Sequence, residues 1–199
     1  DAGRVARLRA GDVPIHEPGL EELLVRNIEE ERLSFTTDLR QAVADCLMIF
    51  LCVGTPVRED GEADISNVLV AAREVGEAMT GYKILVNKTA SPPGTAEELE
   101  RLLRETSGQP CDVVANPDFM KEGTAIDDFL RPDRVIIGCE DVRVREIMRE
   151  LYSPFVRTGK PVLMMGRRSA EMAKYATNLM LATRISLMNQ VADISRLAA

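Results

Sequence analysis

The side chains best suited to chemistry lie in two segments. Asp118, Lys121 and Glu122 directly follow an apolar strand pattern, and Lys174 and Asn178 stand four residues apart in a helical pattern. In an open α/β sheet, ligands bind beyond the carboxyl ends of the strands, which is where the first group would lie. Residues four apart on a helix share one face. Carboxylates, ammonium groups and amides are groups that enzymes use to transfer protons and to hold oxyanions.

Each of these residues also has a structural interpretation. A carboxylate at Glu122 also satisfies backbone N–H groups at a helix N-terminus, and Lys174 and Asn178 also suit a solvated helix face. The neighbours of Lys174 indicate instead that this part of the helix is largely covered, because they are apolar: Met172, Ala173, Ala176, Leu179 and Met180. A covered lysine needs a charged or polar partner.

Alternating strand and helix patterns position these segments. Apolar runs predict strands at 46–53, 84–86, 113–115 and 135–137, and helical spacing predicts helices at 5–10, 65–79, 95–104 and 142–152. The run 46–53 is continuous, as in a strand buried on both faces. The alternation favours right-handed crossovers and a parallel sheet. Residues 169–199 contain no Gly or Pro and predict one long helix that leaves the domain in which it starts.

Composition excludes several classes of protein. The 199 residues are 45% apolar, enough for one large domain or for one domain and the start of another. A net charge of -7 argues against a nucleic-acid partner, and no apolar run is long enough for a membrane span. We expect no metal site, because the cysteines form no CxxC pair and have no nearby His. We expect the four cysteines to be free, buried thiols in a reducing cytosol, namely Cys46, Cys52, Cys111 and Cys139.

Both ends of the sequence read as cut. A dinucleotide-binding half begins with a strand, a Gly-rich turn, a helix and a second strand, but this chain opens on a helical pattern and contains no GxGxxG. The other end still shows a helical pattern. We therefore expect a doubly wound, parallel-sheet domain over residues 1–166 that is incomplete at its N-terminus. Residues 167–199 would form a long connecting helix that begins a second domain.

Six motifs, by their order and spacing, resemble the UDP-glucose/GDP-mannose dehydrogenase family over almost the whole chain. They are residues 14–20, 53–56, 88–95, 116–126, 131–134 and 170–186. The segments around Lys121 and Arg134 resemble the UDP-glucose branch more than the GDP-mannose branch. The resemblance implies a Rossmann-like NAD-binding domain, a cytoplasmic enzyme, and a homodimer formed through the long helix.

The resemblance also implies an activity. Members of this family use NAD+ to oxidise the C6 alcohol of a nucleotide sugar to a carboxylate, in two hydride transfers through a thioester on an essential cysteine. For this chain it implies a UDP-sugar substrate, with UDP-glucose converted to UDP-glucuronate. Such chemistry needs a base, a cation and an amide for the oxyanion, and an activated water. The segment that carries the family cysteine lies downstream of residue 199, so we expect this chain alone to be inactive.

The family roles transfer to particular residues. Glu122 matches the base or water activator, and Lys174 and Asn178 match the lysine and asparagine that flank the reacting C6 oxygen. The stretch from Phe119 to Lys121 matches the one that contacts the nucleotide sugar, partly through main-chain groups. The residues predicted to bind substrate are Asp118, Phe119, Met120, Lys121, Glu122, Lys174 and Asn178.

Four residues are predicted to contact NAD: Arg4, Thr55, Ala90 and Glu122. Arg4 falls where the family usually has a lysine that reaches the NAD ribose, although an ordinary exposed helix arginine explains it equally well. Thr55 ends an apolar strand at a position suited to cofactor contact, although a Thr-Pro pair also simply stops a strand.

Two departures from the family pattern leave alternatives open. The family commonly has a threonine at the position of Ala90, whose hydroxyl is thought to position water or cofactor, and a glutamate at the position of Asp118. The protein could then be a degenerate, non-catalytic relative that binds a nucleotide sugar or a partner. It could also be a dehydrogenase of another nucleotide sugar, such as GDP-mannose or a UDP-N-acetylhexosamine.

Overall fold

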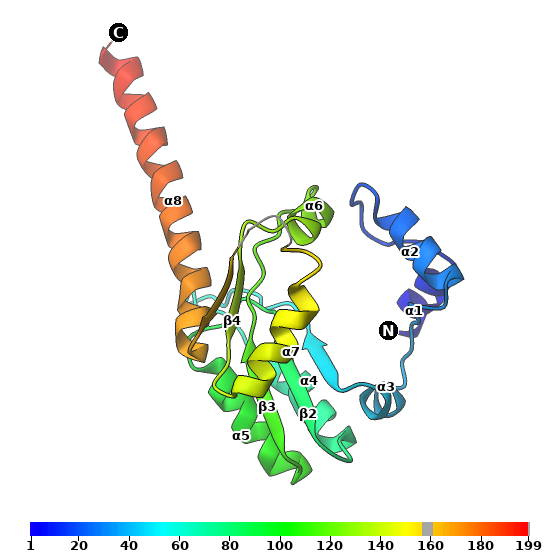
Figure 1. Ribbon diagram of the computed structural model, residues 1–199. Coiled ribbons are helices and arrows are strands. Elements are labelled where there is room, and N and C mark those ends of the chain that lie inside the picture. Colours follow the sequence, from blue (N-terminus) through cyan, green and yellow to red (C-terminus); the bar gives the residue numbers. More distant parts are fainter. Residues whose placement is uncertain (157–160, 199) are drawn as a thin grey trace.

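The computed structural model describes residues 1–156 and 161–198 (Figure 1). The strands form one sheet in the order β1-β2-β3-β4-β5, with bounds β1 Met48–Leu51, β2 Lys83–Asn87, β3 Cys111–Ala115, β4 Val135–Gly138 and β5 Val162–Met165. The helices are α1 Ala2–Arg9, α2 Leu20–Glu29, α3 Leu39–Asp45, α4 Ser66–Ala78, α5 Thr95–Ser107, α6 Ala125–Leu130, α7 Val142–Tyr152 and α8 Arg167–Ala198.

The sheet is parallel except at one pair of strands. β1, β2 and β3 pair in parallel, as do β4 and β5, but β3 and β4 are antiparallel, with Ala115 opposite Gly138. After β3 the chain passes only through the short α6 and re-enters the sheet from the carboxyl end of β3. The prediction of an entirely parallel sheet is wrong at this junction, because no full helical crossover returns the chain to the other end.

Side chains of the strands alternate between two apolar layers. Leu85 and Val113 belong to the layer under α4, α5 and the start of α8, whereas Ile84 and Val114 belong to the layer under α7. Figure 1 shows α7 and α5 on different sides of the strands. Helices therefore cover both faces of the sheet, as predicted for a doubly wound domain.

The first strand differs from its prediction. It spans Met48–Leu51 rather than 46–53, and Phe50 in its centre is 37% exposed. β1 lies at the edge of the sheet and pairs with β2 on one side only among the described residues. The prediction that this strand is buried on both faces is therefore wrong, because a continuous apolar run does not reveal a strand's place in the sheet.

The cysteines divide into two pairs. Cys111 and Cys139 are buried as predicted, but Cys46 and Cys52 are exposed, so for these two the prediction of burial is wrong. Burial raises the pKa of the Cys111 and Cys139 thiols, which keeps them protonated and weakly nucleophilic at neutral pH. The described residues contain no group of three or more His, Cys, Asp or Glu side chains that could hold a metal ion. None of the helices over those residues is long and apolar enough to cross a membrane.

The sequence predicted five of the helices and missed four other elements. The predicted helices at 5–10, 65–79, 95–104, 142–152 and 169–199 correspond to α1, α4, α5, α7 and α8. The missed elements are α2, α3, α6 and β5. α3 and α6 have only seven and six residues, too few to establish an apolar period.

Helix α8 approaches the sheet at a glycine. A Cβ atom placed on Gly138 would lie 2.6 Å from the Cβ of Ala170 and 2.8 Å from the Cα of Arg167. Real Cβ atoms do not come this close to a backbone atom, so only glycine in β4 allows α8 to pack here. Beyond this contact α8 projects away from the sheet (Figure 1).

A buried glutamate joins the same turn of α8 to α5. Glu171 is 3% exposed, and its carboxylate accepts hydrogen bonds from the backbone N–H groups of Gly94 and Ala96 at 2.6 and 2.7 Å. These donors lie at the amino end of α5, where no intrahelical acceptor exists. Burial raises the pKa of Glu171, although the two hydrogen bonds oppose that shift. The contact sets the direction of Lys174, one turn further along α8.

Replacing Gly138 by alanine should destabilise the fold, because the added methyl group meets backbone of α8 that cannot move away cheaply. We expect Gly138→Ala to lower the free energy of unfolding by about 1–3 kcal/mol, measured by urea denaturation. Gly81→Ala is the matched control, because no atom lies within 4 Å of a Cβ built there. Equal stability of the two variants would contradict this packing of α8.

Candidate functional site

A pocket of about 280 Å³ lies at the carboxyl end of β3, between the loop that follows this strand and α8. Six residues predicted from the sequence line it: Asp118, Phe119, Met120, Lys121, Lys174 and Asn178. Its further lining includes Lys88, Asn116, Asp128, Arg134, Tyr152 and Thr177. The structure therefore brings most of the predicted substrate residues together, from segments more than fifty residues apart.

Lys174 is fixed at the wall of this pocket. Its side chain is 14% exposed, and Nζ donates to the backbone oxygen of Asp118 at 2.6 Å and to its Oδ1 at 3.1 Å. The predicted polar partner of this lysine is thus confirmed, and the shorter aspartate reaches it. An ammonium group has three N–H donors, so one remains for a ligand oxygen after the two bonds seen in the described residues. The helix is less covered than predicted, because Met172 and Leu179 are 53% and 69% exposed.

Two cations enclose the ring of Phe119. The guanidinium carbon of Arg134 lies 4.5 Å from the ring centroid, and Nζ of Lys174 lies 5.1 Å from it. Arg134 also donates to Thr177 Oγ1 at 3.4 Å, a long contact that joins the start of β4 to α8. Cation–π contacts of this kind hold the loop residue against the helix. Sequence reasoning assigned Arg134 no role, although its place directly before a strand was visible.

A buried polar chain supports the floor of the pocket. Nζ of Lys88 lies 3.5 Å from the hydroxyl of Tyr152, which donates to Asn116 Oδ1 at 2.6 Å, and Asn116 Nδ2 donates to the backbone oxygen of Ile136 at 2.8 Å. Burial lowers the pKa of Lys88, and the nearby carboxylate of Asp118 opposes this shift. Burial also raises the pKa of Tyr152 to about 12, so its hydroxyl remains a donor. Sequence reasoning missed Lys88 as a site residue.

Glu122 does not line this pocket. It is exposed, and it borders a neighbouring apolar cleft of about 470 Å³ between α2 and α6, whose lining includes Glu17 and Ile126. Lys174 and Asn178 therefore share a pocket, while the third predicted catalytic residue lies beside it.

Two of the predicted cofactor residues are in contact with each other. Thr55, in the loop after β1, donates its hydroxyl to the backbone oxygen of Ala90 in the loop after β2, at 3.0 Å. Arg4 is exposed on α1 and lines neither the pocket nor the cleft beside it. Of the predicted cofactor set, only Thr55 and Ala90 are brought together.

The hydroxyl groups on either side of Ala90 both bond to Asn87. Thr89 Oγ1 donates to Asn87 Oδ1 at 2.6 Å, and Ser91 Oγ accepts from Asn87 Nδ2 at 2.8 Å. Both hydroxyl groups are buried and already engaged with Asn87. These bonds hold both side chains against the end of β2.

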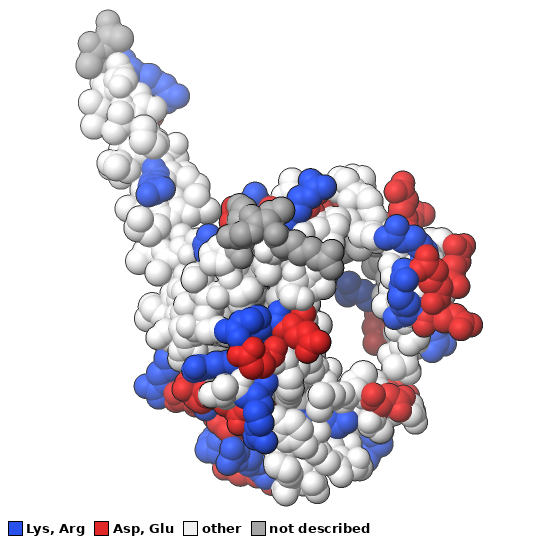
Figure 2. Space-filling view, in the orientation of Figure 1, with Lys and Arg blue, Asp and Glu red and all other residues white. Residues whose placement is uncertain are grey.

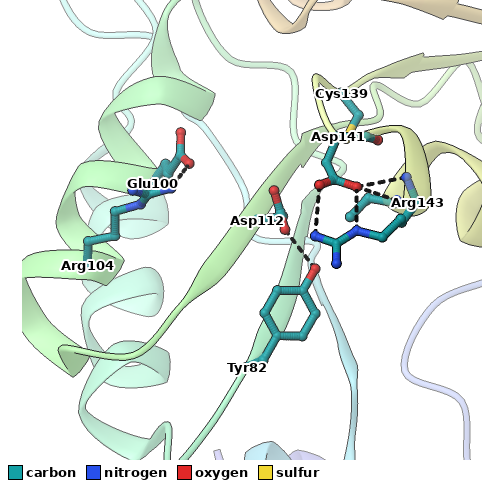
Figure 3. A network of polar contacts seen from close by, with 8 residues as sticks. Tyr82, Glu100, Arg104, Asp112, Cys139, Asp141 and Arg143 are labelled. Atoms are coloured by element: carbon teal, nitrogen blue, oxygen red, sulfur yellow. Dashed lines mark hydrogen bonds and ion pairs between the residues drawn. The ribbon is translucent and has the colours of Figure 1, made fainter.

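A larger hollow of about 690 Å³ lies at the opposite edge of the sheet, where β2 and β3 begin. Figure 3 shows that polar residues of its lining already have partners: Tyr82 donates to Asp112 at 2.7 Å, and Arg143 pairs with the adjacent Asp141 at 3.0 Å. Ligands of open α/β sheets bind at the carboxyl edge. We therefore assign the site to the smaller pocket.

Comparison with known proteins agrees with this geometry. Residues 1–156 match the NAD binding domain of the UDP-glucose/GDP-mannose dehydrogenase family, and residues 168–198 match the central domain of that family. The chain belongs to the UDP-glucose/GDP-mannose dehydrogenase family. The resemblance predicted from the sequence motifs is thus confirmed.

Relatives within the family are similar over nearly the whole chain. It is 48% identical to a UDP-glucose 6-dehydrogenase of Pseudomonas aeruginosa, with 99% of this chain and 45% of that protein covered. It is 44% identical to a UDP-glucose 6-dehydrogenase of Rhizobium meliloti, with 98% and 45% covered. The chain thus spans about half the length of the curated relatives it matches.

Two solved structures of the family have the same fold. A UDP-glucose dehydrogenase of Pyrobaculum islandicum superimposes with a TM-score of 0.91 at 41% identity, covering 96% of this chain and 45% of that one. A GDP-mannose dehydrogenase of Pseudomonas aeruginosa superimposes with a TM-score of 0.89 at 31% identity, covering 95% and 44%.

The carboxyl ends of β1 and β2 are compatible with part of a bound dinucleotide. No atom lies within 4 Å of a Cβ built on Gly54, so there is open space beside Thr55. The Gly-rich turn that binds the pyrophosphate in this fold does not occur in the 199 residues. The residues present therefore fit one end of the cofactor, near the loops that carry Thr55 and Ala90.

The lowered pKa of Lys88 predicts a pH dependence of stability. Between its folded-state pKa and the ordinary value of 10.5, the unfolded chain binds a proton that the folded chain has lost. The free energy of unfolding should therefore rise with pH in this window, relative to a Lys88→Met variant. Urea denaturation at a series of alkaline pH values measures this dependence. Lys121→Met is the control for the loss of a charge, because the Lys121 side chain is 73% exposed. Parallel pH profiles for wild type and Lys88→Met would contradict the burial of this ammonium group.

Proposed function

We propose that the protein containing this chain oxidises the C6 alcohol of UDP-glucose to UDP-glucuronate, in two hydride transfers to NAD+. The observation that carries the proposal is the Lys174 ammonium group, held by Asp118 in a pocket that Asn178 also lines. The higher identity to UDP-glucose 6-dehydrogenases than to the solved GDP-mannose dehydrogenase supports the choice of sugar nucleotide. The catalytic cysteine of the family would come from outside these residues.

In this proposal Lys174 and Asn178 hold the reacting C6 oxygen. The lysine is already oriented by Asp118, so little reorganisation is needed when negative charge develops on that oxygen. The stretch from Phe119 to Lys121 binds the sugar. The backbone N–H of Lys121 donates to Asp128 Oδ2 at 2.9 Å and its carbonyl oxygen accepts from the N–H of Thr124 at 3.2 Å, so we propose that the main-chain groups of Phe119 and Met120 contact the sugar.

Glu122 acts in this proposal as the base or as the activator of water. Its carboxylate must then enter the pocket from the adjacent cleft. Gly123 follows it with φ of +85°, a left-handed conformation that favours glycine. A change at this glycine would redirect the Glu122 side chain.

NAD+ supplies the hydride acceptor. Thr55 and Ala90 would contact it where the loops after β1 and β2 meet, and Arg4 and Glu122 would also contact it. We also propose a domain boundary at residues 166 and 167, and a cytoplasmic location, since free cysteines favour a reducing compartment.

A homodimer formed through α8 is part of the proposal. Its outer turns carry exposed apolar side chains, namely Leu179, Leu181, Ile185, Met188 and Val191. Figure 2 shows this projecting helix with few charged residues. An exposed apolar surface of this kind needs a partner.

Ala90 favours a second candidate, a relative that binds a nucleotide sugar without oxidising it. Thr89 and Ser91, which could supply the missing hydroxyl, are both hydrogen-bonded to Asn87, and this supports the second candidate. Comparing wild type with Ala90→Thr in the full-length protein separates the two. Activity in wild type supports the enzyme, whereas activity only after the substitution supports a degenerate relative.

The proposed function predicts that the full-length protein forms two NADH per UDP-glucose, measured by absorbance, while residues 1–199 alone form none. Lys174→Met should lower kcat by about 100-fold or more, because the oxyanion loses its cation. Arg101→Ala, on the exposed face of α5, is the control. NADH formation with GDP-mannose or a UDP-N-acetylhexosamine but not with UDP-glucose would refute the choice of substrate.

A further inference from the structure

Glu17 joins two segments that are far apart in the sequence. Its Oε2 accepts a hydrogen bond from the backbone N–H of Gly123 at 2.8 Å, and its Oε1 accepts one from the N–H of Ala125, also at 2.8 Å. Both donors lie at the amino end of α6, where no side chain of the N-cap residue Thr124 supplies an acceptor. Such N–H groups have no intrahelical partner, so a carboxylate from elsewhere satisfies them.

The two bonds restrain the peptide that follows Glu122. Gly123 N–H belongs to the peptide group between Glu122 and Gly123, so a bond to it fixes the plane of that group. The second bond, two residues further on, prevents rotation about the first. Asp128 holds the loop against α6 from within, by accepting from the N–H of Lys121 at 2.9 Å and from Thr124 Oγ1 at 3.2 Å, whereas Glu17 joins it to a segment more than a hundred residues away.

The apolar contacts around this link are loose. A cleft of about 470 Å³ separates α2 from α6, with Leu20 and Leu23 on one side and Ile126 and Leu130 on the other. Figure 1 shows α1 and α2 standing apart from the sheet. The position of the loop relative to the N-terminal segment therefore depends on Glu17 more than on packing.

We propose that Glu17 is a positioning residue that holds the Glu122 loop in register with the N-terminal segment. The inference rests on the proposed function, in which Glu122 is the base or water activator. Through the loop before α2, Glu17 also ties Glu122 to α1, which carries the proposed cofactor residue Arg4. If Glu17 only capped α6, its loss would lower the stability of the protein but would leave kcat of the folded enzyme unchanged.

Glu17→Gln in the full-length protein tests the proposal, because it keeps the size of the side chain but replaces one acceptor with a donor. We expect kcat with UDP-glucose and NAD+ to fall about 10- to 100-fold, as for a misplaced catalytic group, with both KM values within about threefold of wild type. Glu17→Asp keeps two acceptor oxygens on a shorter side chain, so its kcat should lie between those of wild type and Glu17→Gln. Glu22→Gln, at an exposed carboxylate in the first turn of α2, is the matched control.

A double mutant shows whether Glu17 acts through Glu122. If it does, Glu17→Gln should lower kcat little further in a Glu122→Gln background. An equal fold-loss in both backgrounds, or an unchanged kcat in the single variant, would overturn the proposal. The proposal would also be overturned if kcat fell only at temperatures where the variant is partly unfolded, because a purely structural cap predicts that result.

Hydrogen exchange separates this proposal from the proposed function. In the same full-length variants, the amides of Gly123 and Ala125 should exchange faster in Glu17→Gln than in Glu22→Gln, and equal rates would overturn the clamp itself. A wild-type protein that is inactive with every nucleotide sugar would refute the proposed function, whereas an active one with unchanged kcat in Glu17→Gln refutes only the positioning role.

Discussion

The close approach of α8 to the sheet at Gly138 determines where the site forms. Because β4 has no side chain there, Ala170 and Arg167 of α8 come within contact of the strand. One turn later Lys174 faces the loop after β3 and reaches Asp118. The antiparallel pairing of β3 and β4 contributes to the same geometry, because β4 begins at the end of the sheet where the loop after β3 lies. A wider separation of helix and strand would leave the lysine without its partner.

Two glutamates complete this arrangement by the same physical means. Glu171 accepts a pair of backbone N–H groups at the start of α5, and Glu17 accepts a pair at the start of α6. Both satisfy donors that a helix cannot satisfy for itself. In both cases the carboxylate comes from a distant part of the sequence, so one contact both caps a helix and joins two distant segments, beside the pocket for Glu171 and beside the adjacent cleft for Glu17.

The sequence predicts those features that depend on local pattern. The spacing of apolar residues predicted α7, and the absence of Gly and Pro predicted α8. The apolar neighbours of Lys174 predicted that this lysine has a polar partner. The identity of that partner followed only from the fold, because Asp118 lies 56 residues away. Edge position explains the exposure of Cys52 beside β1, and loop conformation explains why Glu122 borders the adjacent cleft. The spacing of apolar residues along the sequence reveals neither the order of the strands in the sheet nor the conformation of a loop.

The most direct test of the account is a crystal structure of the full-length protein with UDP-glucose bound. The account predicts that the C6 oxygen lies within hydrogen-bonding distance of Lys174 Nζ and the Asn178 amide, in the pocket at the carboxyl end of β3. A glucosyl group bound elsewhere, such as in the hollow beside Tyr82 and Arg143, with Lys174 still held only by Asp118, would contradict it.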